Sequence, residues 1–188
     1  IKGCVANGID EKAANSIYDS MVDFAKYAFN KSHAAAYAKI SVQTAWLKNY
    51  YPVEFMAALM TSVIDNSAKA AQYLYSCRDM GIKVLPPDIN CGQGEFTAEG
   101  DHVRYGMYAI KSLGRPVIDQ IIEERERGGR YRTLSDFIER TCQKELINKR
   151  AIENLIKAGA CDSLDGTRKQ MAMVYASIVD RVQHDKKS

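Results

Sequence analysis

The chain of 188 residues lacks an apolar run long enough to cross a membrane. Its most apolar stretch, from Val53 to Ile64, is interrupted by Glu54, whereas a spanning helix needs about 18 consecutive apolar residues. The first residues also lack the charged start, apolar core and small-residue cleavage site of a secretory signal. We therefore expect a cytoplasmic protein with no membrane partner. Because the chain begins Ile-Lys-Gly without Met, we also expect it to be a piece of a longer protein.

The chain also lacks clustered metal ligands. No two of its five cysteines lie within four residues of each other, and its three histidines are equally scattered, so the spacing of a zinc site is absent. An odd number of cysteines in a cytosolic chain predicts free, mostly buried thiols. We expect no metal or other cofactor in this chain. The residues concerned are Cys4, Cys77, Cys91, Cys142, Cys161, His33, His102 and His184.

Neither sign of charge dominates. The chain carries 26 basic and 23 acidic residues, a net charge of +3, which is far from the pI above about 9 that is typical of a nucleic-acid domain. The basic surplus lies in residues 141–188 and permits phosphate contacts there. Two acidic pairs, Asp19 with Asp23 and Asp162 with Asp165, do not converge as two-metal catalysis requires. With 46% apolar and 26% charged residues, the composition excludes collagen, a disulfide mini-protein and wholesale disorder.

The apolar spacing predicts a mainly α-helical chain with a small β element. A strand is expected at 82–85, and a hairpin of 95–98 and 102–107 around the turn 99–101. Ser32 is the expected N-cap of the second helix, and Gly81 the residue that ends the fourth. The expected helices span residues 10–28, 33–50, 52–64, 67–80, 116–127, 134–141, 148–157 and 167–183.

The first candidate site is a run of four polar residues of different kinds: Asn30, Lys31, Ser32 and His33. They lie at a predicted helix start, where free N–H groups and the helix dipole favour an anion. The alternative is an ordinary capped helix with an alanine face, from Ala34 to Ala36, packed on its neighbour.

The second candidate site is the segment with Lys111, Ser112, Gly114 and Arg115, which precedes Pro116. A tight turn at Gly114 with a proline near the first helical residue presents backbone N–H groups outward. Flanking cations would complete the way in which a helix-hairpin-helix holds nucleic-acid phosphate without reading bases. The alternative is a plain strand-to-helix connection with incidental basic residues.

The third candidate site is the start of the helix that Asn148 caps and Gly159 ends. Lys149 and Arg150 lie in its first turn, where cations oppose the helix dipole. A phosphate partner would offset this unfavourable placement. The alternative is a solvated charged face.

Five motifs of the chain are informative together. They are Phe-Ala-Lys-Tyr-Ala-Phe-Asn-Lys-Ser-His-Ala-Ala-Ala-Tyr-Ala at 24–38, Gly-Ile-Lys-Val-Leu-Pro-Pro-Asp-Ile-Asn at 81–90, Ala-Ile-Lys at 109–111, Asn-Lys-Arg at 148–150 and Leu-Ile-Lys-Ala-Gly-Ala at 155–160. With these motifs the chain resembles the C-family replicative DNA polymerases of bacteria. The similarity extends over essentially the whole chain.

The resemblance implies three parts: residues 1–90 as the C-terminal part of the polymerase fingers, 91–108 as a small β-hairpin connector, and 109–188 as a tandem helix-hairpin-helix DNA-binding module. It further implies that the palm, whose aspartates bind two Mg²⁺ ions, is missing, so that this fragment catalyses nothing alone. The implied partners are double-stranded DNA and primer-template, an incoming deoxynucleoside triphosphate, the remainder of the polymerase chain and other replisome subunits.

The resemblance also assigns roles to the candidate residues. Asn30, Lys31, Ser32 and His33 would face nucleotide or template. The residues expected to hold duplex backbone are Lys111, Ser112, Gly114 and Arg115, supported by Lys149 and Arg150. The chain departs from the family at the first hairpin, where Ser112-Leu113-Gly114 replaces the usual Gly-Val-Gly. A stand-alone, non-enzymatic DNA-binding helix-hairpin-helix module is the alternative function.

Overall fold

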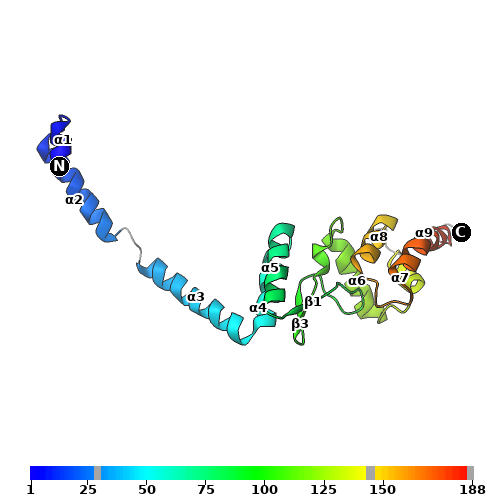
Figure 1. Cartoon of the computed structure of the whole chain (residues 1–188). Helices are drawn as coiled ribbons and strands as arrows, with labels where there is room; N and C mark the ends of the chain where they lie inside the picture. The colour runs from blue at the N-terminus through cyan, green and yellow to red at the C-terminus, as the bar shows by residue number, and fades with distance from the viewer. Residues whose placement is uncertain (28–30, 143–146, 186–188) are drawn as a thin grey trace. The chain divides into compact units, whose positions relative to one another are not determined.

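The computed structural model describes residues 1–27, 31–142 and 147–185, which form two units divided between Asn49 and Tyr50. The described chain is mainly α-helical and carries one three-stranded sheet, as the sequence predicts. Figure 1 shows the order of the elements along the chain. None of the helices in these described ranges is both long enough and apolar enough to cross a membrane.

The amino-terminal unit consists of helices. Asp10 caps the second helix as expected, because its Oδ2 accepts a hydrogen bond of 3.1 Å from the N–H of Ala13. The expectation that Ser32 is an N-cap is wrong, because the next helix already begins at Lys31 and encloses Ser32. The short first helix was not anticipated. The helices are α1 (Lys2–Ala6), α2 (Glu11–Tyr27) and α3 (Lys31–Tyr50).

Most apolar side chains of this unit are exposed within it. Ala14 is the one buried side chain among its described residues. On α2, Ile17, Met21 and Phe24 are exposed by 57%, 64% and 74%, and they line a shallow apolar depression. Their spacing of three and four residues places them on one face of the helix. The unit therefore presents an apolar stripe that its own helices leave uncovered.

The second unit begins with two helices and a small sheet. Pro52 occupies the first turn of α4, as expected for a residue without a backbone N–H. Strands β2 and β3 form the predicted hairpin, and β1 pairs with β3 in parallel, which places Val84 opposite Val103. The sheet order is therefore β1-β3-β2. The bounds are α4 (Pro52–Ser62), α5 (Ser67–Asp79), β1 (Lys83–Leu85), β2 (Thr97–Glu99) and β3 (His102–Arg104).

Helices make up the rest of this unit, and their ends agree with the sequence signals. Asn148 caps α8, since its Oδ1 accepts a hydrogen bond of 3.0 Å from the N–H of Ala151. Gly159 ends the same helix in the left-handed conformation, with φ of 83°. The elements are η1 (Met107–Ala109), α6 (Arg115–Gly128), α7 (Leu134–Thr141), α8 (Lys149–Ala158) and α9 (Arg168–Asp185).

Two apolar clusters stabilise the second unit. One joins α4, α5 and the sheet around Met60, Phe96 and Val103. The larger one unites α6 to α9, and its fully buried side chains include Phe137 and Ile152. Figure 1 shows α7, α8 and α9 next to one another, and α9 packs against both α7 and α8. Burial of apolar surface at about 25 cal/mol per Å² is the main stabilising contribution to such a bundle.

The loop after β1 connects the sheet to the helical bundle. Asn90 is buried, and its Nδ2 donates to the Tyr131 carbonyl oxygen at 3.0 Å and to Ser163 Oγ at 3.1 Å. Its Oδ1 accepts a hydrogen bond of 2.7 Å from the N–H of Tyr131. The N–H of Ile89 donates to the Ala160 carbonyl oxygen at 2.9 Å. This loop thereby fixes the segment before α7 and the turn after α8.

Candidate nucleic-acid interface

The first candidate group lies at the beginning of α3. Lys31, Ser32 and His33 are all exposed there, and the His33 ring contacts the Tyr37 ring at a tilt of 57°, with 4.5 Å between ring centroids. Asn30 lies outside the described residues. The amino-terminal unit is described by itself, and within it these three side chains share one helical turn.

The second candidate group forms the turn between η1 and α6. Ser112 has φ of 63°, the left-handed conformation that a non-glycine residue rarely adopts. Gly114 is the N-cap of α6 with φ of −75° and ψ of 148°, an ordinary extended conformation. The expectation that Gly114 supplies the tight turn is therefore wrong, because Ser112 makes the left-handed bend. Ser112, where the resemblance implies a glycine, thus has a backbone conformation that favours glycine.

The start of α6 has the donors that an anion needs. No side chain caps this helix, and within the described residues the N–H groups of Gly114 and Arg115 donate to no protein acceptor. Pro116 has no N–H, so these two groups are the free donors at this end of the helix. Lys111 and Arg115 are exposed beside them. The turn combines free amides, a helix dipole and two cations, which together favour a phosphate.

Arg115 is already held by two neighbours. Its Nη2 lies 3.1 Å from Asp65 Oδ2, in the turn between α4 and α5, and its Cζ lies 5.0 Å from the centre of the Tyr108 ring. The Tyr108 hydroxyl donates a short hydrogen bond to Asp119, and this hydrogen bond raises the pKa of Tyr108. Because Asp65 and Arg115 remain largely exposed, a phosphate can compete with Asp65 for the guanidinium group.

The third candidate group lies in the first turn of α8. Lys149 Nζ forms an ion pair of 2.5 Å with Asp180 Oδ1 on α9. Arg150, the next residue, is exposed. The unfavourable placement of a cation in a first helical turn is thus offset at Lys149 by a protein carboxylate. Of the two cations, Arg150 is the one left available for a phosphate.

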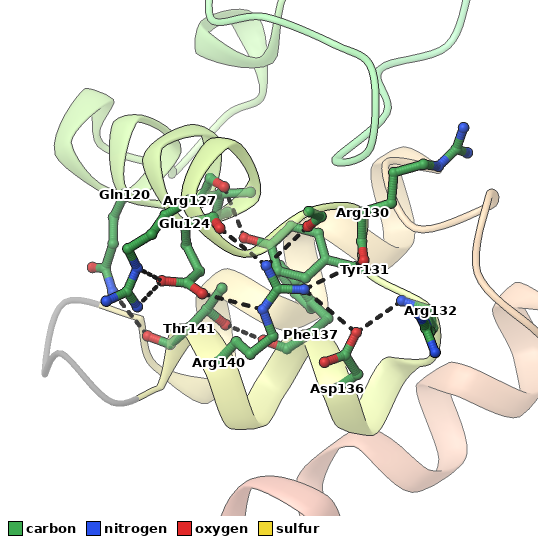
Figure 2. Close-up of polar contacts among 12 residues, drawn as sticks. Gln120, Glu124, Arg127, Arg130, Tyr131, Arg132, Asp136, Phe137, Arg140 and Thr141 are labelled. Carbon is green, nitrogen blue, oxygen red and sulfur yellow. Dashed lines mark hydrogen bonds and ion pairs between the residues drawn. The ribbon is translucent and has the colours of Figure 1, made fainter.

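A cluster around Arg140 was not anticipated from the sequence. Its side chain donates to the Gly129 carbonyl oxygen at 2.9 Å and to Glu124 Oε1 at 3.1 Å, and it lies 4.4 Å above the Tyr131 ring. Figure 2 shows this guanidinium group at the centre of the contacts between α6 and α7. Partial burial of the Glu124 carboxylate opposes its ionisation. The hydrogen bonds from Arg127 and Arg140 outweigh this effect and lower the pKa of Glu124. The cluster therefore has a structural role.

The cysteines and acidic residues of the described ranges do not gather into a second site. None of the five cysteines forms a disulfide in the described structure, and Cys77, Cys142 and Cys161 are buried, as predicted. Burial raises the pKa of the Cys161 thiol to about 12, which makes it unreactive near neutral pH. Over residues 1–27, 31–142 and 147–185, no three His, Cys, Asp or Glu side chains are grouped as metal ligands.

Comparison with known proteins shows which proteins this chain is similar to. Residues 81–171 match a family model described as a helix-hairpin-helix motif. The DNA polymerase III subunit alpha of Saccharopolyspora erythraea is 46% identical over 180 residues, 96% of this chain and 15% of the relative. The corresponding subunit of Thermus aquaticus is 44% identical over 172 residues, 92% of this chain and 14% of the relative. That of Vibrio cholerae is 46% identical over 183 residues, 97% of this chain and 15% of the relative.

The chain corresponds to a small part of these relatives. The identity covers almost the entire chain, whereas the chain spans only 14–15% of the length of these three relatives. The match at 81–171 contains two of the candidate groups, the turn before α6 and the first turn of α8. The chain is therefore homologous to one region of the DNA polymerase III alpha subunit, and this region carries a helix-hairpin-helix motif.

Proposed function

We propose that this chain is a segment of a replicative DNA-directed DNA polymerase catalytic subunit that holds DNA and catalyses nothing by itself. Residues 1–90 form the C-terminal part of the fingers, 91–108 a small β connector, and 109–188 a tandem helix-hairpin-helix module that holds duplex backbone. The parent enzyme is a nucleotidyltransferase whose aspartates bind two Mg²⁺ ions in a palm outside these residues. The identity of about 45% to polymerase III alpha subunits supports this assignment.

The observation that carries the proposal is the geometry at the start of α6. The N–H groups of Gly114 and Arg115 point to no protein acceptor in the described part of the chain, and Lys111 and Arg115 stand exposed beside them. Amides and cations in this arrangement bind the DNA backbone without reading its sequence. Ser112 supplies a left-handed bend two residues before Gly114. These four residues are the proposed first contact with duplex DNA.

The start of α8 is the proposed second contact. Arg150 is exposed there, and its neighbour Lys149 pairs with Asp180. In our proposal Arg150 binds phosphate directly, while Lys149 supports it by holding α8 against α9. A chain with two such contacts grips duplex DNA at two points of one module.

In the parent polymerase, the amino-terminal unit contacts incoming nucleotide or template. Lys31, Ser32 and His33, on one exposed helical turn, supply a cation and hydrogen-bond donors; Asn30, which precedes them, is part of the proposed site. The exposed apolar stripe of Ile17, Met21 and Phe24 supports burial of this unit by other parts of the polymerase.

Duplex binding by the chain tests the proposal. A fluorescently labelled duplex is titrated at several salt concentrations and its anisotropy measured, with Kd values of about 10⁻⁴–10⁻⁶ M expected for backbone contacts. The Lys111→Ala/Arg115→Ala double variant should flatten the slope of log K against log salt by up to about 2. Lys2→Ala/Lys12→Ala, which removes the same charge from exposed sites, is the matched control. An unchanged slope in the hairpin variant would contradict this contact.

The nucleotide contact is tested in the full polymerase. Lys31→Ala should raise KM for nucleotide or lower kcat about tenfold to a hundredfold, since a charge-assisted hydrogen bond contributes about 1.5–3 kcal/mol. Lys12→Ala serves as the control, as it removes a similar exposed charge from α2. The chain alone should show no primer extension with Mg²⁺ and all four nucleotides. Template-dependent extension by the pure chain would refute the proposal that this chain catalyses nothing by itself.

A further inference from the structure

We propose that the loop between α6 and α7, residues 129–133, is a third binding element for the phosphates of double-stranded DNA, with Arg130 and Arg132 as its cations. This inference rests on the proposed function, in which residues 109–188 hold duplex DNA. It adds a site away from the two helix starts. The observations that carry it are the fixed backbone of the loop, the lack of partners for both guanidinium groups among the described residues, and the neighbouring turn after α8.

The backbone of the loop is held at each residue. Tyr131 is 2% exposed, exchanges two hydrogen bonds with Asn90, and donates its hydroxyl to the Ile121 carbonyl oxygen at 2.7 Å. Arg140 donates to the carbonyl oxygens of the two preceding residues, at 2.9 and 3.3 Å. The N–H of Arg132 donates to Asp136 Oδ2 at 2.9 Å. Tyr131 is thus an anchor, and the side chains before and after it project from a fixed backbone.

Among the described residues, the two projecting cations have no acidic partner. Both Arg130 and Arg132 are exposed, and in the part of the chain that the structure describes neither guanidinium group forms an ion pair or hydrogen bond. Figure 2 shows the Arg130 side chain extending away from the contact cluster. The nearby carboxylates are engaged elsewhere: Glu124 by Arg127 and Arg140, and Asp136 by Arg140 and the Arg132 amide.

The loop lies beside the turn that follows α8. Residues 128–132, together with Asp136 and Arg140, line an open depression whose remaining wall is Ser163. Ser163 belongs to the turn between α8 and α9, and its Oγ donates to Asp88 Oδ1 at 2.8 Å. The Asn90 amide links the two walls, because it donates to both Ser163 and Tyr131. The arginine pair is therefore fixed next to the turn that follows α8, at the opposite end of this helix from Arg150.

The chemistry of this surface fits a phosphate backbone. A guanidinium group offers a planar fork that matches phosphate oxygens in a bidentate geometry. A fixed backbone reduces the entropy lost when the side chains bind. Because the two arginines project from residues on either side of a buried anchor, they can engage neighbouring phosphates without a change in the loop.

The test compares two double variants of the full chain. Arg130→Ala/Arg132→Ala should weaken binding to a labelled duplex about fivefold to thirtyfold at low salt and flatten the salt slope by up to about 1.8. Arg78→Ala/Lys83→Ala, which removes two exposed cations from α5 and β1, should leave the slope nearly unchanged. The thermal melting of each variant is measured, and we expect wild-type values because both pairs of side chains are exposed.

The same titration separates this inference from the proposed function. If the wild-type chain binds no duplex, the proposed function itself fails. If Lys111→Ala/Arg115→Ala weakens binding while Arg130→Ala/Arg132→Ala does not, only the third element is refuted. Equal weakening by the Arg78/Lys83 control would also refute it, since binding would then follow net charge. A flatter salt slope in the loop variant, with an unchanged slope in the Arg78/Lys83 control and unchanged melting of both, supports the third element.

Discussion

The guanidinium group of Arg115 lies 3.1 Å from the carboxylate of Asp65, fifty residues earlier in the chain. Arg115 is the first residue of α6 and Asp65 lies in the turn after α4. The ion pair joins the sheet-bearing part of this unit to the proposed DNA contact. It also gives the same cation two possible partners, a protein carboxylate or a phosphate.

We predict that Asp65→Asn strengthens duplex binding. Without the competing carboxylate, Arg115 is free for phosphate, and since an exposed ion pair contributes about 0.2–1 kcal/mol the gain should be at most about fivefold at low salt. Anisotropy of a labelled duplex measures it. Asp101→Asn makes the same charge change in the turn between β2 and β3, where the nearest basic group is His102. An equal gain in this control would mean that net charge, not Arg115, accounts for the effect.

We predict that Ser112→Gly stabilises the chain. For a residue with a Cβ, the left-handed conformation costs about 1–2 kcal/mol of folding free energy. Glycine avoids this cost, but its greater loss of chain entropy on folding costs about 0.4–1 kcal/mol. The net gain should be about 0.5–1 kcal/mol, measured by chemical or thermal unfolding. Ser112→Ala keeps the strained φ and removes only the hydroxyl, so it should be neutral. A gain of the same size in Ser112→Ala would assign the effect to the side chain instead.

The first turn of α8 offers a comparison between adjacent cations. Arg150→Ala should lower the slope of log K against log salt for duplex binding by about 1. Lys149→Ala should lower this slope by less, because the Lys149 ammonium group already forms an ion pair of 2.5 Å with Asp180. Lys149→Ala should instead weaken the contact of α8 with α9, by at most about 1 kcal/mol for an exposed pair. Identical slopes in the two variants would show that the ion pair with Asp180 does not reduce the contribution of Lys149 to duplex binding.

We predict that Asn90→Ala destabilises the second unit strongly. It leaves the buried N–H and carbonyl groups of Tyr131 without their partner, and each unsatisfied buried group costs about 1–3 kcal/mol, so the total loss should be about 2–4 kcal/mol. Asn66→Ala is the control, since it removes one exposed cap hydrogen bond on α5 and should cost about 1 kcal/mol. Equal losses in the two variants would contradict the role of Asn90 as a link. Unfolding in urea measures both.

Apart from α1 and η1, the sequence alone predicted the elements, because their signals are local. The cap at Asn148 and the helix ends at Gly81 and Gly159 each depend on residues within four positions of the helix end. The β2–β3 hairpin likewise follows from a short turn between two strands. The exception at Ser32 has the same origin, because several polar residues in a row offer more than one possible helix start.

Only the tertiary structure decided which cations are available for a ligand. The partner of Arg115 is 50 residues away, and Asn90 reaches Tyr131 and Ser163 across 41 and 73 residues. No local periodicity encodes such pairs, since they depend on how separate elements pack. Packing places Asp180 beside Lys149, surrounds Arg140 with acceptors, and leaves Arg130 and Arg132 without them in the described structure. The residue types came from the sequence, whereas the three-dimensional arrangement of their carboxylates and carbonyls determined which charges remain free.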